Sequence, residues 1–253
     1  MKQPVVGLQD LHCHLDLYPD FEEQIQSRER NGVRTLTVTT TPKAWPRNKE
    51  LTHGLEFVRA ALGLHPELVA GAPGELEIWE KYLHEAEYIG EVGLDGRRDN
   101  KRSLPKQIEV FTHILKCCDR LKKRVISVHS AGAIKDVLRL LESNIHNSET
   151  RVILHWFTGA KSEAERAVQN GYYFSVNQRM LTTKKWKELA SAIPLQRLLV
   201  ETDAPFIHKK YADQEVQLIK VSMELMAESF GLDMRGLGNI LNQNFFRLFI
   251  PST

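Results

Sequence analysis

His12 and His14 stand two residues apart in the stretch LQDLHCHLDLYP, with Cys13 between them. Side chains at positions i and i+2 of a β-strand point to the same face, so the two imidazoles would face one side and Cys13 the other. Imidazole binds zinc, copper, iron and nickel, so the pair is a candidate metal site, and we expect Cys13 in the core. Because 10 histidines in 253 residues give ~0.4 such pairs at random, the pair needs support from elsewhere in the chain.

Other ionisable side chains stand at or near the ends of short apolar runs. The runs VRAALGLH and RLLVETD end in His65 and Asp203, and the runs YIGEVGLD, RVISVHS and RVILHWF contain Glu91, His129 and His155. Each has a structural explanation by itself, such as a rim histidine, a buried ion pair for Glu91 or a turn before Ala-Pro for Asp203. A shared metal site explains them together. With the first pair they exceed the ligands of one tetrahedral ion, which favours two ions bridged by a carboxylate.

These runs alternate with segments whose apolar residues recur with the helical period, such as 104–121 and 134–141. Two closing helices are expected over 213–230 and 237–249. Eight strand–helix units with buried strands predict parallel pairing and a (β/α)₈ TIM barrel, whose chemistry lies at the C-terminal ends of the strands. A doubly wound open sheet is the main alternative. The eight strand-like runs are VVGLQDLH, TLTVTTT, VRAALGLH, YIGEVGLD, RVISVHS, RVILHWF, YYFSV and RLLVETD.

Composition limits the class of protein. The chain is 42% hydrophobic and 26% charged, with no Pro/Gly/Ser linker, so we expect one globular domain over 1–253. No run approaches the ~18 apolar residues of a membrane span, and the N-terminus does not resemble a secretory signal. Three cysteines make no disulfide framework, which favours the cytoplasm. A net charge of +2 excludes a protein-wide attraction to nucleic acid, so anion binding must come from local clusters.

The motifs DLHCHLD, LGLHP, IGEVGLD, ISVHS, ILHWFTG and LLVETDAPF, followed by NQNFFRLF, resemble those of the TatD family of metal-dependent deoxyribonucleases, within the amidohydrolase-like barrels. They occur in the family order from residue 10 to 249. The stretches DLHCHLDLYPD and VTTTPKAW also resemble the TatD-type members encoded in Qat antiphage-defence operons. That resemblance implies a role in antiviral defence and partners among the other proteins of such an operon.

The family resemblance implies a role for each matching residue. His12, His14, Glu91 and Asp203 would hold one ion, and Glu91, His129 and His155 the second, with Glu91 bridging. His65 would contact the substrate phosphate and Glu201 would support the Asp203 loop. Family members use magnesium, manganese or zinc. Two loops depart from the family pattern: Gly96 replaces a common aromatic residue, and FIHKKYADQE follows the ETDAP motif without the usual Asn-Pro element.

The implied reaction is metal-assisted hydrolysis of a phosphodiester, with DNA ends or single strands as substrate. Asp203 would position water and accept its proton, and His65 and the second ion would offset charge on the phosphoryl oxygens. The predicted catalytic residues are therefore Asp203, Glu91 and His65. Two alternatives stay open: a barrel hydrolase of another ester or amide, such as an aminoacyl-tRNA, and a metal-binding subunit of a defence complex.

Basic and aromatic residues that follow the strands are candidates for substrate contact, or are solvated charge and packing. The basic candidates are Arg97, Arg98, Lys101, Arg102, Arg179, Lys184, Lys185, Lys187, Lys209 and Lys210. The aromatic candidates for base stacking are Trp45, Trp156 and Phe157. Together with His65, we expect Arg97, Arg98, Lys184, Lys185 and Trp156 to bind the substrate.

Overall fold

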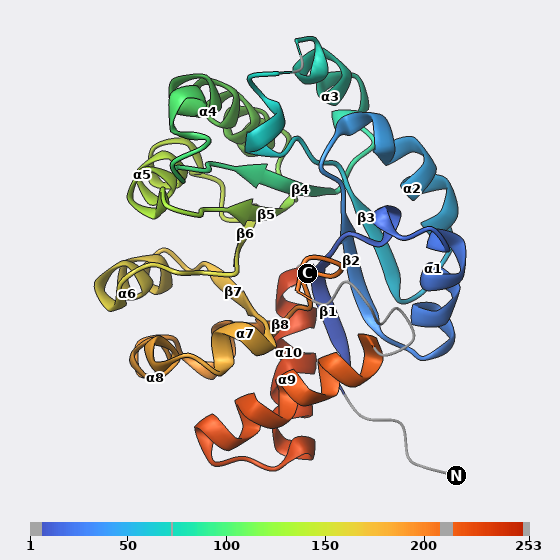
Figure 1. The fold of residues 1–253 in the computed structure, drawn as a ribbon, viewed down its shortest axis with the longest axis vertical. Helices are drawn as coiled ribbons and strands as arrows, with labels where there is room; N and C mark the ends of the chain where they lie inside the picture. Colours follow the sequence, from blue (N-terminus) through green and yellow to red (C-terminus); the bar gives the residue numbers. More distant parts are fainter. Residues whose placement is uncertain (1–6, 72, 208–214, 250–253) are drawn as a thin grey trace.

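Parallel strands and helices alternate along the chain and close into a barrel with an outer layer of helices (Figure 1). The structure is a computed structural model that describes residues 7–71, 73–207 and 215–249. The strands are β1 (Gln9–Cys13), β2 (Arg34–Val38), β3 (Val58–Ala61), β4 (Tyr88–Gly93), β5 (Val125–His129), β6 (Arg151–His155), β7 (Tyr173–Val176) and β8 (Leu198–Val200). The helices are α1 (Phe21–Arg30), α2 (Trp45–Thr52), α3 (Glu75–Leu83), α4 (Leu104–Leu121), α5 (Ile134–Asn144), α6 (Lys161–Gln169), α7 (Gln178–Leu181), α8 (Lys184–Ala190), α9 (Glu215–Phe230) and α10 (Met234–Phe249). In the described part of the chain, no helix combines the length and apolarity that crossing a membrane requires.

Hydrogen bonds join the eight strands into one closed ring. β1–β2–β3 and β4 through β8 form two continuous parallel ladders. At one seam the Leu62 amide, just after β3, donates to the Tyr88 carbonyl of β4 at 2.9 Å. At the other seam the Asp203 amide, after β8, donates to the His12 carbonyl of β1 at 2.9 Å. The predicted TIM barrel is therefore confirmed, and the open doubly wound sheet is excluded.

The two-residue period of the strands separates an inner core from an outer one. In β5, Val125 belongs to an apolar cluster that it shares with Ile153 of β6 and Leu199 of β8. The alternate residues Ile126 and Val128 pack in the larger cluster that includes the helices. This period directs every second side chain of a strand into the barrel, which is how buried strands can carry polar residues to its mouth.

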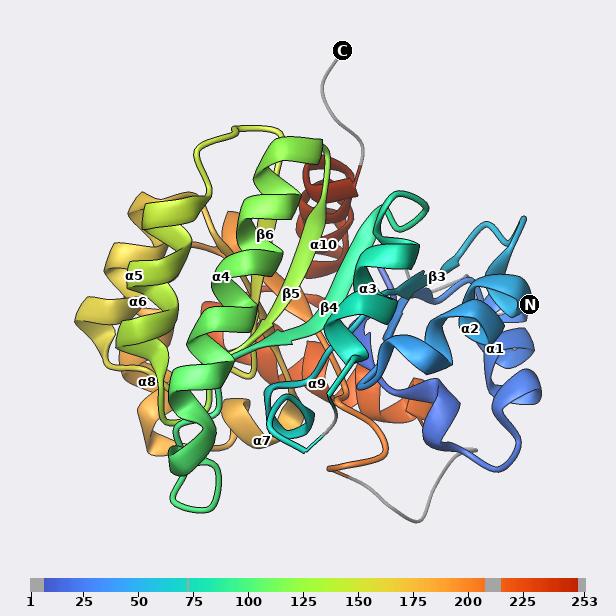
Figure 2. The same ribbon diagram turned by 90° about the horizontal axis from the view of Figure 1, so that it is seen from above.

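The last helix closes one end of the barrel and leaves the other open (Figures 1 and 2). Leu248 and Phe249 of α10 pack with Tyr88 and Val125, which begin β4 and β5. The helix begins at Met234, three residues before the predicted start, because the Asp233 carboxylate accepts a hydrogen bond from the Gly236 amide and caps it. α9 matches the end of the predicted segment 213–230, whose first two residues lie outside the described residues.

A buried ion pair connects the start of the barrel to its last strand. Asp10 accepts hydrogen bonds from the backbone and hydroxyl of Thr202 at 2.8 and 2.7 Å, and its Oδ2 lies 3.1 Å from the buried Arg28 guanidinium. We expect Asp10→Ala to lower the free energy of unfolding by about 3–5 kcal/mol, because the buried ion pair with Arg28 and both hydrogen bonds from Thr202 would be lost. Urea unfolding would measure this, and Glu23→Ala, which removes the exposed pair with Arg30, should cost less than about 1 kcal/mol. Equal effects of the two substitutions would contradict the prediction.

Candidate metal centre and active-site cavity

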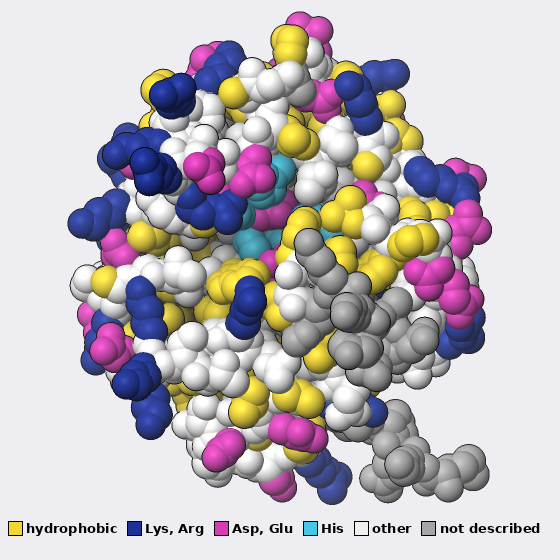
Figure 3. Space-filling view, viewed as in Figure 1, with side chains coloured by type: hydrophobic (Ala, Val, Ile, Leu, Met, Phe, Trp, Pro, Cys, Tyr) yellow, Lys and Arg dark blue, Asp and Glu magenta, His cyan; other side chains and the backbone are white. Residues whose placement is uncertain are grey.

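A cavity of about 520 Å³ opens at the C-terminal ends of the strands. In the space-filling view, histidine and acidic side chains lie at the base of this hollow (Figure 3). The volume is within the range of small-molecule and cofactor sites. The predicted metal or catalytic residues that line it are His14, His65, Glu91, His129, His155 and Asp203. His12 is fully buried next to them.

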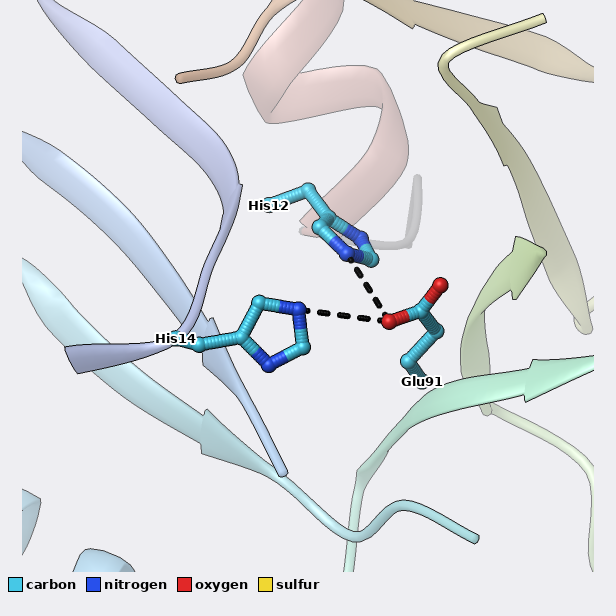
Figure 4. A group of neighbouring side chains, drawn as sticks. All are labelled: His12, His14 and Glu91. Atoms are coloured by element: carbon cyan, nitrogen blue, oxygen red, sulfur yellow. Dashed lines mark ion pairs between the residues drawn. The ribbon is translucent and has the colours of Figure 1, made fainter. Parts of the chain in front are cut away.

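One oxygen of Glu91 faces the histidine pair of β1 (Figure 4). Glu91 Oε2 lies 3.5 Å from His12 Nε2 and 3.2 Å from His14 Nε2. Asp203 Oδ1 lies 3.8 and 3.7 Å from the same two nitrogens. Cys13, between the histidines, packs instead in an apolar cluster that includes Ile25. The side chains thus gather two imidazoles and two carboxylates around one point.

The other oxygen of Glu91 faces a second group of histidines. Glu91 Oε1 lies 2.5 Å from His129 Nδ1, 2.9 Å from His155 Nε2 and 3.4 Å from His65 Nε2. The nitrogens of His155 and His129 lie 3.5 Å apart. Glu91 therefore stands between two clusters, with one oxygen directed to each.

Residues behind the histidines orient the rings. His12 Nδ1 lies 2.8 Å from the Ser127 hydroxyl, and His129 Nε2 lies 3.0 Å from Asp95 Oδ2. Such outer partners select the tautomer of a ligating histidine and raise its basicity. We did not single out Ser127 or Asp95 from the sequence. Two sequence features could have identified them: Ser127 lies two residues before His129, and Asp95 is a carboxylate that follows Glu91 in EVGLD.

Glu201 supports a different part of the site from the one expected. Its carboxylate accepts hydrogen bonds from the side chains of Ser175 and Asn177 and from the Trp156 amide, and it lies 3.5 Å from His155 Nδ1. These contacts hold the ends of β6 and β7. The loop that carries Asp203 is held by the Thr202 contacts described above.

Strained backbone shapes two positions of the site. Trp156 and Asp203 have φ values of 39° and 49°, in the left-handed region that non-glycine residues rarely adopt. Hydrogen bonds from their own amides, to Glu201 and to the His12 carbonyl, hold both residues there. Gly93 is needed for a related reason, since a Cβ at its φ of 142° would lie 2.1 Å from the His129 carbonyl oxygen. The backbone of β4 thereby approaches β5 closely beside Glu91.

Charge and burial shift the pKa values of the two central carboxylates in opposite directions. Burial would raise the pKa of Glu91, but the surrounding histidines, His65 foremost, hold it well below its usual value. Burial raises the pKa of Asp203 to about 7, although His155 and His14 oppose the shift. The histidine neighbours thus favour the anionic form of Glu91, whereas burial favours the protonated form of Asp203.

Comparison with known proteins identifies the family. The family described as TatD related DNase matches residues 9–250. The chain belongs to the TatD family. Its assignment to this family makes it a hydrolase acting on ester bonds.

Relatives of known sequence or structure span nearly the whole chain. The human deoxyribonuclease TATDN3 is 29% identical over 98% of this chain and 97% of its own length. The Escherichia coli protein YcfH, named a metal-dependent hydrolase, is 30% identical over 96% of this chain and 95% of its own. The crystal structure of the TatD homologue YjjV from Escherichia coli has a TM-score of 0.84 at 25% identity, covering 98% of this chain and all of YjjV. A probable 2-pyrone-4,6-dicarboxylic acid hydrolase from Acinetobacter baumannii shares the fold at a TM-score of 0.53 and 11% identity.

The residues present fit the divalent metal that such hydrolases use. Nε2 of His12 and both ring nitrogens of His14 are buried without a hydrogen-bond partner among the described residues, whereas buried polar atoms normally have one. Two ligands at about 2.1 Å from a tetrahedral ion lie roughly 3.4 Å apart. The distances of 3.2–3.8 Å that separate these nitrogens from the Glu91 and Asp203 oxygens are close to that spacing.

The predicted substrate-binding residues fall into two groups. Trp156 and Arg97 line the cavity, and the Lys185 ammonium donates to the carbonyl of Thr158, which also lines it. Arg98 and Lys184 are exposed but do not line the cavity. A contact of any of these residues with substrate remains a prediction.

Other candidates are settled by burial or fall outside the described residues. Trp45 and Phe157 are 3% and 1% exposed, so packing accounts for both and neither can stack on a base. Gly96, where an aromatic residue is common in the family, packs against Gly132, whose carbonyl oxygen would lie 2.5 Å from an added Cβ. The two loops after β4 and β5 therefore approach each other too closely for a larger residue. Lys209 and Lys210 lie outside the described residues.

Proposed function

We propose that this protein is a divalent-metal-dependent nuclease that hydrolyses phosphodiester bonds of DNA ends or single strands. The arrangement of Glu91 carries the proposal, because its two oxygens face two separate histidine clusters at the base of one cavity. A carboxylate shared in this way is the bridging ligand expected in a two-metal hydrolase. The family description and the name of the human relative support DNA as the substrate.

Two sets of residues that share Glu91 would each bind one ion. His12, His14, Glu91 and Asp203 would hold one ion, and Glu91, His129 and His155 the other, with magnesium, manganese or zinc as candidates. When bound, such ions supply hydroxide near neutral pH and offset charge on the phosphoryl oxygens. Asp203 orients the attacking water and accepts its proton.

His65 fits the role of a phosphate contact. Its side chain is 12% exposed, lines the cavity, and accepts a hydrogen bond at Nδ1 from the Glu67 amide. That bond places a proton on Nε2, which lies 3.4 Å from Glu91 Oε1 and would donate to a phosphoryl oxygen at the edge of the second cluster.

The depth of the site favours a single strand over a duplex. His12 is fully buried and Glu91 is 3% exposed, so a phosphodiester must enter the barrel mouth to reach them. A frayed end or a single strand can do so more readily than a paired backbone. The resemblance to Qat-encoded proteins adds the proposals of a role in antiphage defence and of partners from such an operon, with the chain acting as one cytoplasmic domain.

The test is cleavage of end-labelled single- and double-stranded DNA and RNA by protein reconstituted with Mg²⁺, Mn²⁺ or Zn²⁺. We expect single-stranded DNA to be cleaved, a chelator to stop cleavage, and added Mn²⁺ or Mg²⁺ to restore it. If metal-loaded protein cleaves no nucleic acid but hydrolyses a carboxylic ester or an aminoacyl-tRNA, the alternative barrel-hydrolase reaction replaces this proposal. If it hydrolyses none of these substrates, the alternative of a metal-binding subunit in a defence complex replaces it.

A further inference from the structure

Large hydrophobic side chains gather around the mouth of the active-site cavity. Four such side chains are exposed in the described part of the chain, and three of them line the cavity: Leu17 at 45%, Leu68 at 37% and Phe206 at 49%. The fourth, Phe246, lies on α10 at the closed end of the barrel. Single exposed hydrophobic residues are ordinary, whereas a group at the edge of a cavity marks a binding surface. We call Leu17, Leu68 and Phe206 the apolar arc.

The apolar arc occupies one side of the mouth. Leu17 ends the 3₁₀ turn after β1, Leu68 ends the turn after β3, and Phe206 follows β8. β8 adjoins β1, and only β2 separates β1 from β3, so the three positions lie along one continuous part of the ring (Figure 1). Phe206 packs edge-on against the ring of His14 at a centroid distance of 5.0 Å. A group resting on the arc would therefore lie directly beside the first histidine cluster.

Basic residues reach the cavity from other parts of the ring. Arg97, after β4, donates to Asp95 and Glu67, so carboxylates already balance its charge. Arg179 of α7, after β7, is exposed and lines the cavity, and its guanidinium has no carboxylate partner within the described ranges. In Figure 3, hydrophobic and basic side chains both border the hollow that holds the histidines. Arg179 is thus a cation without a carboxylate partner in the described part of the chain, and it lines the same cavity as the apolar arc.

We propose that the apolar arc is a base-binding platform. An unstacked base of a single strand packs against Phe206, Leu17 and Leu68, while Arg179 binds a phosphate of the same strand. The inference rests on the proposed nuclease function and adds what selects the substrate. A single strand presents apolar base faces alternating with anionic phosphates, which matches a surface that is apolar on one side and cationic on another. In a duplex, neighbouring pairs cover both faces of each base. Because every base has a π-face, the platform is indifferent to sequence.

The test compares two single strands of equal length and charge, one with normal bases and one in which every nucleotide is an abasic tetrahydrofuran analogue. For the holoenzyme we expect kcat/KM to be about 5- to 150-fold higher on the strand with bases, the effect of one base–aromatic contact. The triple variant Leu17→Ala, Leu68→Ala, Phe206→Ala should bring this ratio close to one. Arg179→Ala should lower kcat/KM on both strands and leave the ratio unchanged.

Two controls keep the test decisive. Phe246→Ala removes an equally exposed aromatic ring far from the cavity and should retain the wild-type ratio. Since Phe206 touches His14, metal content is measured for each variant. If the triple variant loses metal, the double variant Leu17→Ala, Leu68→Ala replaces it and should lower the ratio below that of the wild type. A protein that cleaves both strands equally well, or a triple variant with the wild-type ratio, would overturn the platform while the nuclease function stands. Cleavage of neither strand by metal-loaded protein would instead overturn the nuclease function.

Discussion

Replacing Asp203 with asparagine is expected to lower kcat on single-stranded DNA by about 10³-fold or more while the barrel stays folded. Asparagine preserves the shape of the side chain but has neither the negative charge that helps to hold metal nor the basicity that accepts a proton from water. The substitution removes the carboxylate whose Oδ1 lies 3.8 and 3.7 Å from Nε2 of His12 and of His14.

Steady-state kinetics at saturating metal would measure this effect, and circular dichroism would establish that the variant is folded. Asp136→Asn is a matched control, because that exposed carboxylate pairs only with the exposed Arg139 in the described structure and does not line the cavity. Turnover of Asp203→Asn within a factor of about three of wild type would remove Asp203 from the proposed chemistry.

Replacing Glu91 with glutamine is expected to have a comparable effect through a different cause, the loss of both metals. The wild-type protein should retain about two divalent ions per chain after incubation with Zn²⁺ or Mn²⁺ and removal of the excess. In Glu91→Gln the single carboxylate whose oxygens face His14 and His129 becomes a neutral amide. Loss of an outer partner of a ligand already costs about 10–100-fold in metal affinity, and loss of a shared ligand should cost more.

Elemental analysis and anomalous diffraction would count and place the ions. Glu75→Gln is the matched control, since Glu75 is also buried but pairs with Lys43 and Thr41, and it should keep the wild-type metal content. Two ions bound to Glu91→Gln with wild-type affinity would show that Glu91 does not bridge. Wild-type protein that binds only one ion would contradict the two-ion arrangement.

The order of the strands and helices could be predicted from the sequence because apolar residues recur with different spacings in the two kinds of element. Each of the eight predicted strand runs overlaps a strand of the barrel, and the segment 104–121 coincides with α4. The helix boundaries differ from the predicted ones. α5 continues to Asn144, where the Asn144 side chain donates to the Leu140 carbonyl and the Ile145 amide donates to the Leu141 carbonyl. α10 begins earlier because Asp233 caps it. The spacing of apolar residues indicates which face of a helix is buried, but the start of a helix depends on whether a carboxylate such as Asp233 binds the free backbone amides.

The candidate metal residues could also be predicted from the sequence, since each lies in the C-terminal half of a buried strand or just after it, and parallel strands bring their C-terminal ends together. Which of these side chains face one another in the barrel could not be predicted from the sequence. Register shifts in β1 between Asp10 and Cys13, and in β4 between Ile89 and Val92, re-aim the side chains near these points, and a one-residue shift changes the face of a strand.

Tertiary structure alone decided which side chains are exposed and which partners they have. Trp45 and Phe206 are both aromatic residues that follow a strand, Trp45 at the start of α2 and Phe206 in the loop after β8, yet Trp45 is buried and Phe206 is half exposed at the cavity. Arg97 and Arg179 carry the same charge, yet only Arg97 has carboxylate partners among the described residues. Residue type and strand order are properties of the chain, whereas exposure and charge compensation depend on neighbours that are distant in sequence and meet only when the barrel closes.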